Sequence, residues 1–369
     1  MKILHIVHWA RSGIGVVVRD LVRHRSSDIE HVVVCLAPGK PTTDQIRDAG
    51  ARVYEPAQAI SWPASVSLLR KRIRLDQGDV VHSHSLTPRV IATLGATGIP
   101  HLTTIHTAYL YFQSPGIRNA LKRGLECVAA RRLSAPCVCV SDDVARCLPC
   151  TSMTSRAVVI ANGIDLERAR CAADEAHVEL TGDPVLVAVG RLDWEKGFDR
   201  LLAAIAAVRS RFPGIRLVIC GDGVERQALE SQAQDLGLGA AVLFTGHVAN
   251  PMPYFLAADA FVSSSVQEGF GLTAAEAMAL GRPVIATPAS GVGSALRDGE
   301  TAIMASGFRP EDIADAIVRA FSDRERLRRV ADAGRRFAET SLDVRRAVAA
   351  YERLYRDLVR PPTHAGKND

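Results

Sequence analysis

The sequence lacks several features that would place it in common classes of protein. No apolar run approaches eighteen residues, so no segment is long enough to cross a membrane as a helix. No signal-peptide cleavage pattern follows the first apolar segment, residues 3–7, and no repeat or low-complexity tract is visible. We therefore expect a cytoplasmic globular protein in which only the tail, residues 361–369, is disordered.

Complete cysteine and glycine motifs are also missing. Of the eight cysteines, only Cys147 and Cys150 have the spacing of a metal or redox pair, and no second pair accompanies them. Most of the others lie inside apolar runs and are expected to be buried as small hydrophobic side chains. Gly13 and Gly15 follow the first strand, but Val18 stands where a dinucleotide-binding fingerprint needs a third glycine. The pair of glycines is a weak signal for a phosphate-binding loop.

Length and charge distribution indicate two domains of different character. The 369 residues exceed what one hydrophobic core usually serves, and strands alternate with helices, which is typical of α/β proteins with parallel sheets. Residues 1–175 hold 22 Lys and Arg against 15 Asp and Glu, a net charge of +7. Residues 176–369 hold 23 against 25, a net charge of −2. A turn followed by an aperiodic stretch favours a boundary near residues 165–180.

The positive charge of the first half is concentrated in two segments. Residues 69–74 hold four cations, and the helix-like segment 118–132 holds Lys122, Arg123, Arg131 and Arg132. Both segments mix cations with apolar residues at helical spacing, which suits an anionic membrane surface or a phosphorylated lipid. Solvated helices that bury an apolar inner face would produce the same pattern, and both interpretations stay open.

The most informative segment for function is residues 268–276, which begins with Glu268 and ends with Glu276. The apolar run 260–265 predicts a strand before it, and the good helix formers of residues 273–280 predict a helix within and after it. The pattern is therefore a strand, a glycine-rich loop and a helix.

This arrangement is suited to a ligand that carries phosphate and sugar. The free amides around Gly271 and Leu272 at the start of the helix favour an anion such as a diphosphate. Glu268 and Glu276 flank that position, and each carboxylate can accept two hydrogen bonds from the vicinal hydroxyls of a sugar. As alternatives, Glu268 caps the helix and Glu276 is an ordinary solvated residue.

A second loop carries two cations. The apolar strand predicted at residues 185–189 is followed by Arg191 and Lys196, and a helix is predicted at residues 198–208. The two cations would lie at the carboxyl end of a strand, where open α/β sheets bind ligands. Ordinary solvated cations would explain either residue alone, but explain both less well.

With these motifs in this order, the chain resembles the retaining glycosyltransferases of family 4, which have the GT-B fold. The ordered matches extend over about residues 158–290, and weaker ones over the whole chain. They are Arg191 with Lys196, the strand and turn 217–223, the segment 242–248, the pair Glu268 and Glu276, and the segment 281–287.

The resemblance implies two Rossmann-like domains with parallel sheets that face a central cleft. Residues 1–170 would form the acceptor-side domain and residues 171–340 the domain that binds the nucleotide-sugar donor. A helix at residues 341–360 would pack back on the first domain, through an apolar stripe that includes Tyr351 and Tyr355.

The resemblance also implies a role for each motif residue. Arg191 and Lys196, with the amides near Gly271, would stabilise the charge of the departing diphosphate. They would replace a metal, because no two Asp residues here are separated by one position, as they are in the metal-binding Asp-x-Asp pair of other sugar-transferring enzymes. Glu276 would hold the ribose. Glu268 would hold hydroxyls of the transferred sugar and face its developing positive charge.

His106 completes the predicted site. It ends an apolar strand and matches the family's catalytic-cleft histidine, although a lone histidine at a strand end is more often structural. The predicted catalytic residues are His106, Glu268, Arg191 and Lys196. The predicted donor-binding residues are Gly13, Gly15, Arg191, Lys196, Val248, Glu268, Phe270, Gly271, Leu272 and Glu276. We expect neither a metal nor a cofactor.

The predicted function is transfer of a hexose, with retention of configuration, from a UDP- or GDP-linked sugar. The expected acceptor is a glycan or a polyprenyl-linked glycan of cell-surface polysaccharide or lipopolysaccharide, reached from the cytoplasm at the anionic inner face of the membrane. We expect no nucleic-acid partner. Two alternatives stay open, an isomerase similar to nucleotide-sugar 2-epimerases and a non-catalytic nucleotide-sugar-binding protein. The sequence leaves open the sugar, the nucleoside, the acceptor, the linkage, the retaining mechanism, the oligomeric state and any role of Cys147 and Cys150.

Overall fold

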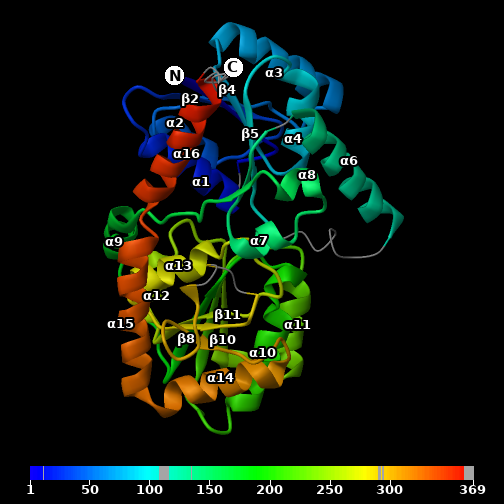
Figure 1. Ribbon diagram of the computed structural model, residues 1–369. Coiled ribbons are helices and arrows are strands. Elements are labelled where there is room, and N and C mark those ends of the chain that lie inside the picture. Colours follow the sequence, from blue (N-terminus) through cyan, green and yellow to red (C-terminus); the bar gives the residue numbers. More distant parts are fainter. Residues whose placement is uncertain (11, 108–115, 134, 290–291, 293–294, 361–369) are drawn as a thin grey trace, which may run out of the picture. The chain divides into compact units, whose positions relative to one another are not determined.

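A computed structural model describes residues 1–10, 12–107, 116–133, 135–289, 292 and 295–360 (Figure 1). The predicted disordered tail therefore lies outside the described residues. The chain divides into two compact units, Met1–Ile160 with Val344–Asp369, and Ala161–Asp343. We call them the first and the second unit. Their assignment as acceptor-side and donor-side domains stays a prediction.

The first unit holds a parallel sheet whose described strands run in the order β3-β2-β1-β4-β5-β6-β7. These strands are β1 (Lys2–Val7), β2 (Glu30–Cys35), β3 (Arg52–Tyr54), β4 (Val80–His84), β5 (His101–Ile105), β6 (Cys137–Cys139) and β7 (Ala157–Val159). The helices are α1 (Ser12–Arg23), α2 (Thr42–Asp48), α3 (Trp62–Asp76), α4 (Leu86–Gly95), α6 (Ile117–Leu133), α7 (Asp142–Arg146), α8 (Thr151–Thr154) and α16 (Val344–Val359).

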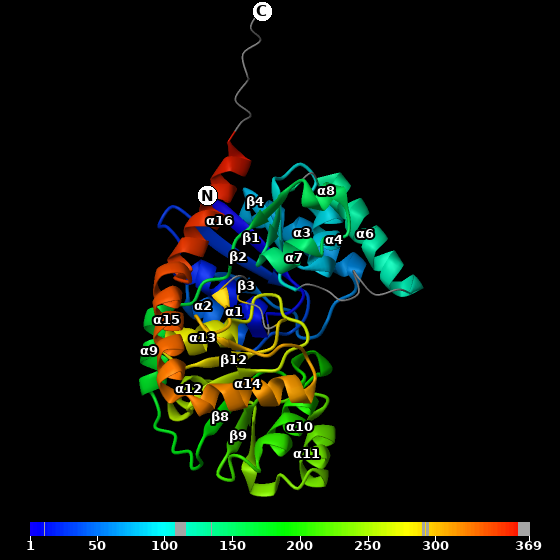
Figure 2. The ribbon, with the colours of Figure 1, turned by 60° about the horizontal axis from the view of Figure 1, so that its bottom comes forward.

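Alternation of side chains along the strands gives this sheet an apolar core on each face. On one face, Leu4 and Ile6 of β1 pack with Leu69 of α3. On the other face, Val7 packs with Val18 of α1. Helix α4 contacts both α3 and α6, and Figures 1 and 2 show these three helices next to one another.

Helix α16 also belongs to the first unit, where it contacts α1 and β4. Its side chains Val348, Tyr351 and Tyr355 are buried, so the apolar stripe seen in the sequence faces the protein interior. Glu352 is buried on the same helix and accepts hydrogen bonds from the amide (2.7 Å) and the hydroxyl (2.5 Å) of Ser26. These contacts fix the helix against the loop between α1 and β2.

The second unit holds a parallel sheet in which the described strands follow the order β10-β9-β8-β11-β12-β13. They are β8 (Val185–Val189), β9 (Arg216–Cys220), β10 (Val242–Gly246), β11 (Ala260–Ser263), β12 (Val284–Ala286) and β13 (Ile303–Met304). The helices are α9 (Leu166–Asp174), η1 (Trp194–Lys196), α10 (Phe198–Val208), α11 (Arg226–Asp235), η2 (Gly239–Ala241), α12 (Met252–Ala257), α13 (Leu272–Ala279), α14 (Pro310–Ser322) and α15 (Arg324–Ser341).

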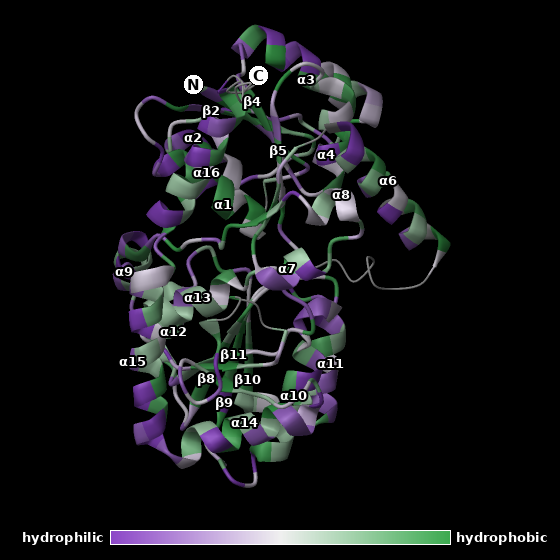
Figure 3. Ribbon diagram, in the orientation of Figure 1, coloured by the Kyte–Doolittle hydropathy of each residue, from purple (hydrophilic) through white to green (hydrophobic). Residues whose placement is uncertain are grey.

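The central strands of this sheet are apolar on both faces, as Figure 3 shows for β8 and β11, because helices cover them. The predicted α/β class with parallel sheets is confirmed. Strand order reverses between β8 and β11, since β9 and β10 extend the sheet in one direction and β12 and β13 in the other. Such a switch point is where open α/β sheets bind ligands, at the carboxyl ends of the strands.

Candidate functional site

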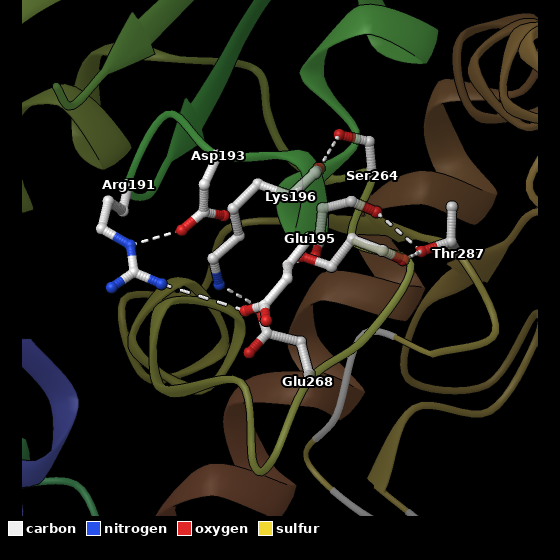
Figure 4. A network of polar contacts seen from close by, with 9 residues as sticks. Arg191, Asp193, Glu195, Lys196, Ser264, Glu268 and Thr287 are labelled. Atoms are coloured by element: carbon white, nitrogen blue, oxygen red, sulfur yellow. Dashed lines mark hydrogen bonds and ion pairs between the residues drawn. The ribbon is translucent and has the colours of Figure 1, made fainter. Parts of the chain in front are cut away.

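The two motif loops of the second unit meet at this switch point. Residues 190–197 follow β8 and residues 264–271 follow β11, and the two strands are neighbours in the sheet. The hydroxyl of Ser264 donates to the carbonyl oxygen of Lys196 (2.8 Å), and the amide of Val266 donates to the carbonyl oxygen of Glu195 (2.9 Å). These two contacts hold the cation-bearing loop against the loop that carries Glu268 (Figure 4).

Lys196 and Glu268 form an ion pair between their Nζ and Oε1 atoms, as Figure 4 shows. The Lys196 side chain is 22% exposed and the Glu268 side chain 14%, so the pair is largely withdrawn from water. The hydroxyl of Ser265 donates a second hydrogen bond to Glu268 Oε1, at 2.9 Å. Lys196 was predicted to contact the diphosphate and Glu268 the transferred sugar, and the structure shows that the two side chains contact each other directly.

Arg191 lies at the same edge and is the most exposed of the predicted charged residues. Its side chain is 60% exposed, its Nε donates to the carboxylate of Asp193, and an Nη2 atom lies 3.9 Å from Glu195 Oε2. Burial, with the nearby charge of Asp193, raises the pKa of Glu195. Sequence reasoning missed both carboxylates, although they follow Arg191 at two and four positions within the same loop.

A glycine is required where the cation-bearing loop turns into α10. Gly197 has a φ of 61°, a backbone conformation that side-chain-bearing residues rarely adopt. A Cβ atom there would collide with the carbonyl oxygen of Ser264. The close approach of the two loops, which brings Lys196 to Glu268, therefore depends on the missing side chain.

Helix α13 begins at Leu272, directly after Gly271, which has a φ of 80°. The first amides of a helix lack partners within it, so they are available to an anion. Leu272 and Glu276 are half-buried, and Glu276 lies one turn inside the helix. The Phe270 side chain is buried in the protein interior. Any contact of Phe270 with a donor would therefore come from its main chain.

The remaining predicted residues lie elsewhere. Val248 follows β10 in the second unit and is half-buried. Gly13 and Gly15 lie in the first turn of α1 in the first unit, where a Cβ atom on Gly15 would collide with the carbonyl oxygen of Ala10. His106 directly follows β5 in the first unit, and its Nε2 atom lies 2.9 Å from His84 Nδ1. Burial lowers the pKa of His106.

Sequence reasoning also missed a group of histidines around His106. Among the described residues, His5, His82 and His84 are buried and form the one group whose potential metal-ligand atoms lie close together, within 4.8 Å. The spacing of His82 and His84 by two positions is a signal that could have placed them on one face of a strand, but only the register of β1 against β4 shows that His5 joins them. Cys147 and Cys150 are half-buried and are not joined in a disulfide.

Comparison with known proteins covers both units. The family model "Glycosyltransferase Family 4" matches residues 11–168, and the model "Glycosyl transferases group 1" matches residues 172–337. The chain is 31% identical over 371 residues to a D-inositol 3-phosphate glycosyltransferase of Rhodococcus erythropolis, an alignment that covers 90% of this chain and 80% of the relative.

Two further similarities were found, one in the sequence of part of the chain and one in the fold of nearly the whole chain. The chain is 37% identical over 164 residues to the lipopolysaccharide core biosynthesis glycosyltransferase LpsE of Rhizobium meliloti, covering 44% of this chain and 47% of LpsE. The fold is similar to that of the Anabaena protein HepE, solved with UDP-glucose, with a TM-score of 0.79 and 18% identity over 97% of this chain and 99% of HepE. The chain therefore belongs to the family 4 glycosyltransferases of the GT-B fold, and is a hexosyltransferase of that family.

Proposed function

We propose that the protein transfers a hexose from a nucleoside-diphosphate sugar, with retention of configuration and without a metal, to a glycan acceptor. The observation that carries this proposal is the meeting of Arg191, Lys196 and Glu268 beside the start of α13, at the switch point of the second sheet. This one edge offers cations and free amides for a diphosphate and a carboxylate for sugar hydroxyls.

The reaction breaks the bond between the anomeric carbon and a diphosphate oxygen and forms a bond from that carbon to an acceptor oxygen, which loses its proton. Negative charge grows on the diphosphate and positive charge on the sugar ring, so a catalyst must stabilise both. Arg191, Lys196 and the first amides of α13 would stabilise the leaving group. Glu268 would face the sugar, and Glu276 would hold the ribose.

UDP is the first nucleotide to test. UDP-glucose is bound in HepE, whose fold this chain shares, and GDP-linked sugars stay the second candidate. The positive charge that a divalent metal supplies in other transferases would come here from Arg191 and Lys196. This arrangement predicts that chelating agents leave turnover unchanged.

For the acceptor, we favour a lipid-linked glycan at an anionic membrane surface. LpsE acts in lipopolysaccharide core biosynthesis, and the first unit presents a helix suited to such a surface. On α6, the side chains of Ile117, Leu121, Leu125 and Val128 are exposed, at spacings of four, four and three residues along one helix face. Arg131 and Arg132 are exposed at the end of the same helix. An apolar stripe beside cations is typical of helices that lie in a membrane interface.

Within the described residues, none of the helices combines the length and apolar character of a membrane span, so the proposed attachment is peripheral. Sedimentation with vesicles tests it. Leu121→Ser should reduce binding to vesicles that contain anionic lipid, because it removes an exposed apolar side chain from the stripe on α6. Val224→Ser is the matched control, because Val224 is 93% exposed on the second unit. Equal binding of the Leu121→Ser variant and the wild type would contradict the membrane role of α6.

A soluble phosphorylated acceptor is the second candidate, favoured by the similarity to the D-inositol 3-phosphate glycosyltransferase. The decisive experiment incubates UDP- and GDP-hexoses with each acceptor class and follows the anomeric proton of the product by NMR. The proposal predicts acceptor-dependent release of nucleoside diphosphate and a product with the donor's anomeric configuration. Inversion of configuration would overturn the retaining assignment. Conversion of the donor sugar without any acceptor would favour the isomerase.

A further inference from the structure

Four histidines in the first unit form a continuous chain of nitrogen-to-nitrogen contacts that ends at His106. His31 Nδ1 lies 2.7 Å from His5 Nε2, His5 Nδ1 lies 3.0 Å from His84 Nε2, and His84 Nδ1 lies 2.9 Å from His106 Nε2. The rings come from β2, β1, β4 and the residue after β5, which are successive neighbours in the sheet. His5, His31 and His84 are buried.

The rings in this chain are neutral. Burial lowers the pKa of His5 and His84 well below its ordinary value, and it lowers the pKa of His31 to about 3. A neutral imidazole carries one proton on one of its two nitrogens, so it donates through one nitrogen and accepts through the other. Each contact in the chain therefore needs one protonated and one unprotonated nitrogen.

This requirement couples the four rings. If His5 carries its proton on Nδ1, it donates to His84 and accepts from His31, and His84 in turn must donate to His106. All four protons are then on Nδ1. If His5 carries its proton on Nε2, the same reasoning puts all four protons on Nε2. Since every ring follows its neighbours, the chain has two arrangements, and whatever selects one at His31 also selects it at His106.

The far end of the chain decides between the two arrangements. His31 Nε2 is buried and has no hydrogen-bond partner among the described residues. A proton on that atom would be an unpaired buried donor, which proteins rarely contain. This cost favours an unprotonated Nε2 and hence the arrangement with every proton on Nδ1.

We propose that His31, His5 and His84 are positioning residues that fix the tautomer of His106, so that it presents a neutral Nδ1–H hydrogen-bond donor to an oxygen atom of a bound substrate. In this tautomer His106 has no lone pair on Nδ1. It therefore binds a hydroxyl or phosphate oxygen and does not act as a general base through that nitrogen. The part that concerns the substrate rests on the proposed function, whereas the tautomer itself does not.

A metal held by His5, His82 and His84 is the competing explanation for the cluster. Two nitrogens bound to one tetrahedral zinc lie about 3.3 Å apart, given bonds of about 2.0–2.1 Å. His5 Nδ1 and His84 Nε2 are closer, at 3.0 Å. Both nitrogens of His82 are already hydrogen-bonded, to Tyr355 Oη and Thr104 Oγ1, each at 2.7 Å. The hydrogen-bonded chain accounts for these distances without a metal.

Nitrogen NMR of protein labelled with ¹⁵N-histidine tests the proposal directly in the wild type. The expected spectrum shows His5, His31, His84 and His106 with a protonated Nδ1 and an unprotonated Nε2. A proton on Nε2 of His106 would overturn the proposal. So would zinc or another metal bound stoichiometrically to the purified protein, measured by elemental analysis.

A variant that should reverse the tautomers along the histidine chain supplies the functional test. In His31→Glu the carboxylate only accepts hydrogen bonds, so His5 must donate through Nε2, and the tautomers of His84 and His106 should reverse with it. The expected loss in kcat/KM is about 2- to 10-fold, the value of one neutral hydrogen bond. The control is His101→Gln, because His101 is buried and bonds Ser83 Oγ (2.9 Å) outside the chain. It should change neither the His106 tautomer nor kcat/KM.

Two results separate the parts of the proposal. If His31→Glu folds and His106 keeps its proton on Nδ1, the coupling through the chain is overturned. If the tautomer reverses and kcat/KM stays at the wild-type value, the histidine chain stands and the role of His106 as a hydrogen-bond donor to the substrate is overturned.

A second pair of variants checks that hydrogen-bonding role without changing His31. His106→Asn places an amide donor near the Nδ1 position and should retain more activity than His106→Gln, which places it near Nε2.

Discussion

Lys196→Met is the substitution that most sharply probes the chemistry of the site. The change removes the cation that pairs with Glu268 and keeps much of the apolar length of the side chain. A charge-assisted hydrogen bond is worth roughly 1.5–3 kcal/mol, so loss of the Lys196 contact with a departing diphosphate should lower kcat/KM by about 10- to 100-fold.

The effect on folding should be much smaller. Lys196 is 22% exposed and Glu268 keeps its hydrogen bond from Ser265, so solvent and the hydroxyl compensate for part of the lost pair. Initial rates of nucleoside-diphosphate release, measured beside a urea unfolding curve, separate activity from stability. Lys40→Met is the matched control, because Lys40 is 71% exposed and pairs at 3.9 Å with Asp44 of the first unit. Activity of Lys196→Met within about twofold of wild type would refute the leaving-group role.

Three further predictions concern binding and stability. Glu276→Gln should raise KM for the donor about tenfold with little change in kcat, because a ribose contact is the same in the ground and transition states. Tyr355→Phe should lower the free energy of unfolding by about 1–3 kcal/mol, because it leaves buried His82 Nδ1 without its 2.7 Å partner. Burial lowers the pKa of His101 to about 3, so the folded state binds fewer protons than the unfolded state below about pH 6.5, and stability should fall as the pH decreases from that value.

Each of these has a direct check. Steady-state kinetics of Glu276→Gln would contradict the ribose assignment if kcat fell and KM did not change. For Tyr355→Phe, urea unfolding or faster hydrogen exchange in β4 measures the loss, and wild-type protection of β4 would count against it. The pH effect is measured as the urea midpoint at about pH 7.5 and about pH 5, where most carboxylates are still ionised. His101→Gln should show a smaller decrease than wild type, and an equal decrease would remove His101 as a cause.

Much of the second unit could be predicted because its signals are local. The apolar run 185–189 is β8, and the helix predicted at residues 273–280 is α13, observed one residue earlier as Leu272–Ala279. Parallel strands share one edge for their carboxyl ends, so Arg191, Lys196 and Glu268 could be placed at the same end of a sheet before the structure was known.

What the sequence could not provide is the identity of contacts between distant positions. Lys196 and Glu268 are 72 positions apart, and their pairing depends on the adjacency of β8 and β11. The histidine chain depends on the order and register of four strands, which the sequence does not reveal. His106 could be selected from the other histidines only through the family's motif. His31, His5 and His84, which fix the tautomer of His106 in our proposal, lie on three different strands. Their positions in the sequence therefore do not show that they form a chain with His106.

The central claim is that the second unit binds a nucleoside diphosphate through its own cations, without a metal. Thermal unfolding with UDP, GDP, ADP or CMP, each with and without EDTA, tests it most directly. A ligand at about a hundred times its dissociation constant adds roughly 2.7 kcal/mol to the stability of the folded state. We predict that one nucleoside diphosphate stabilises the wild type equally in the presence and absence of EDTA, and stabilises Lys196→Met less. Stabilisation by no nucleotide, or only with added metal, would contradict it.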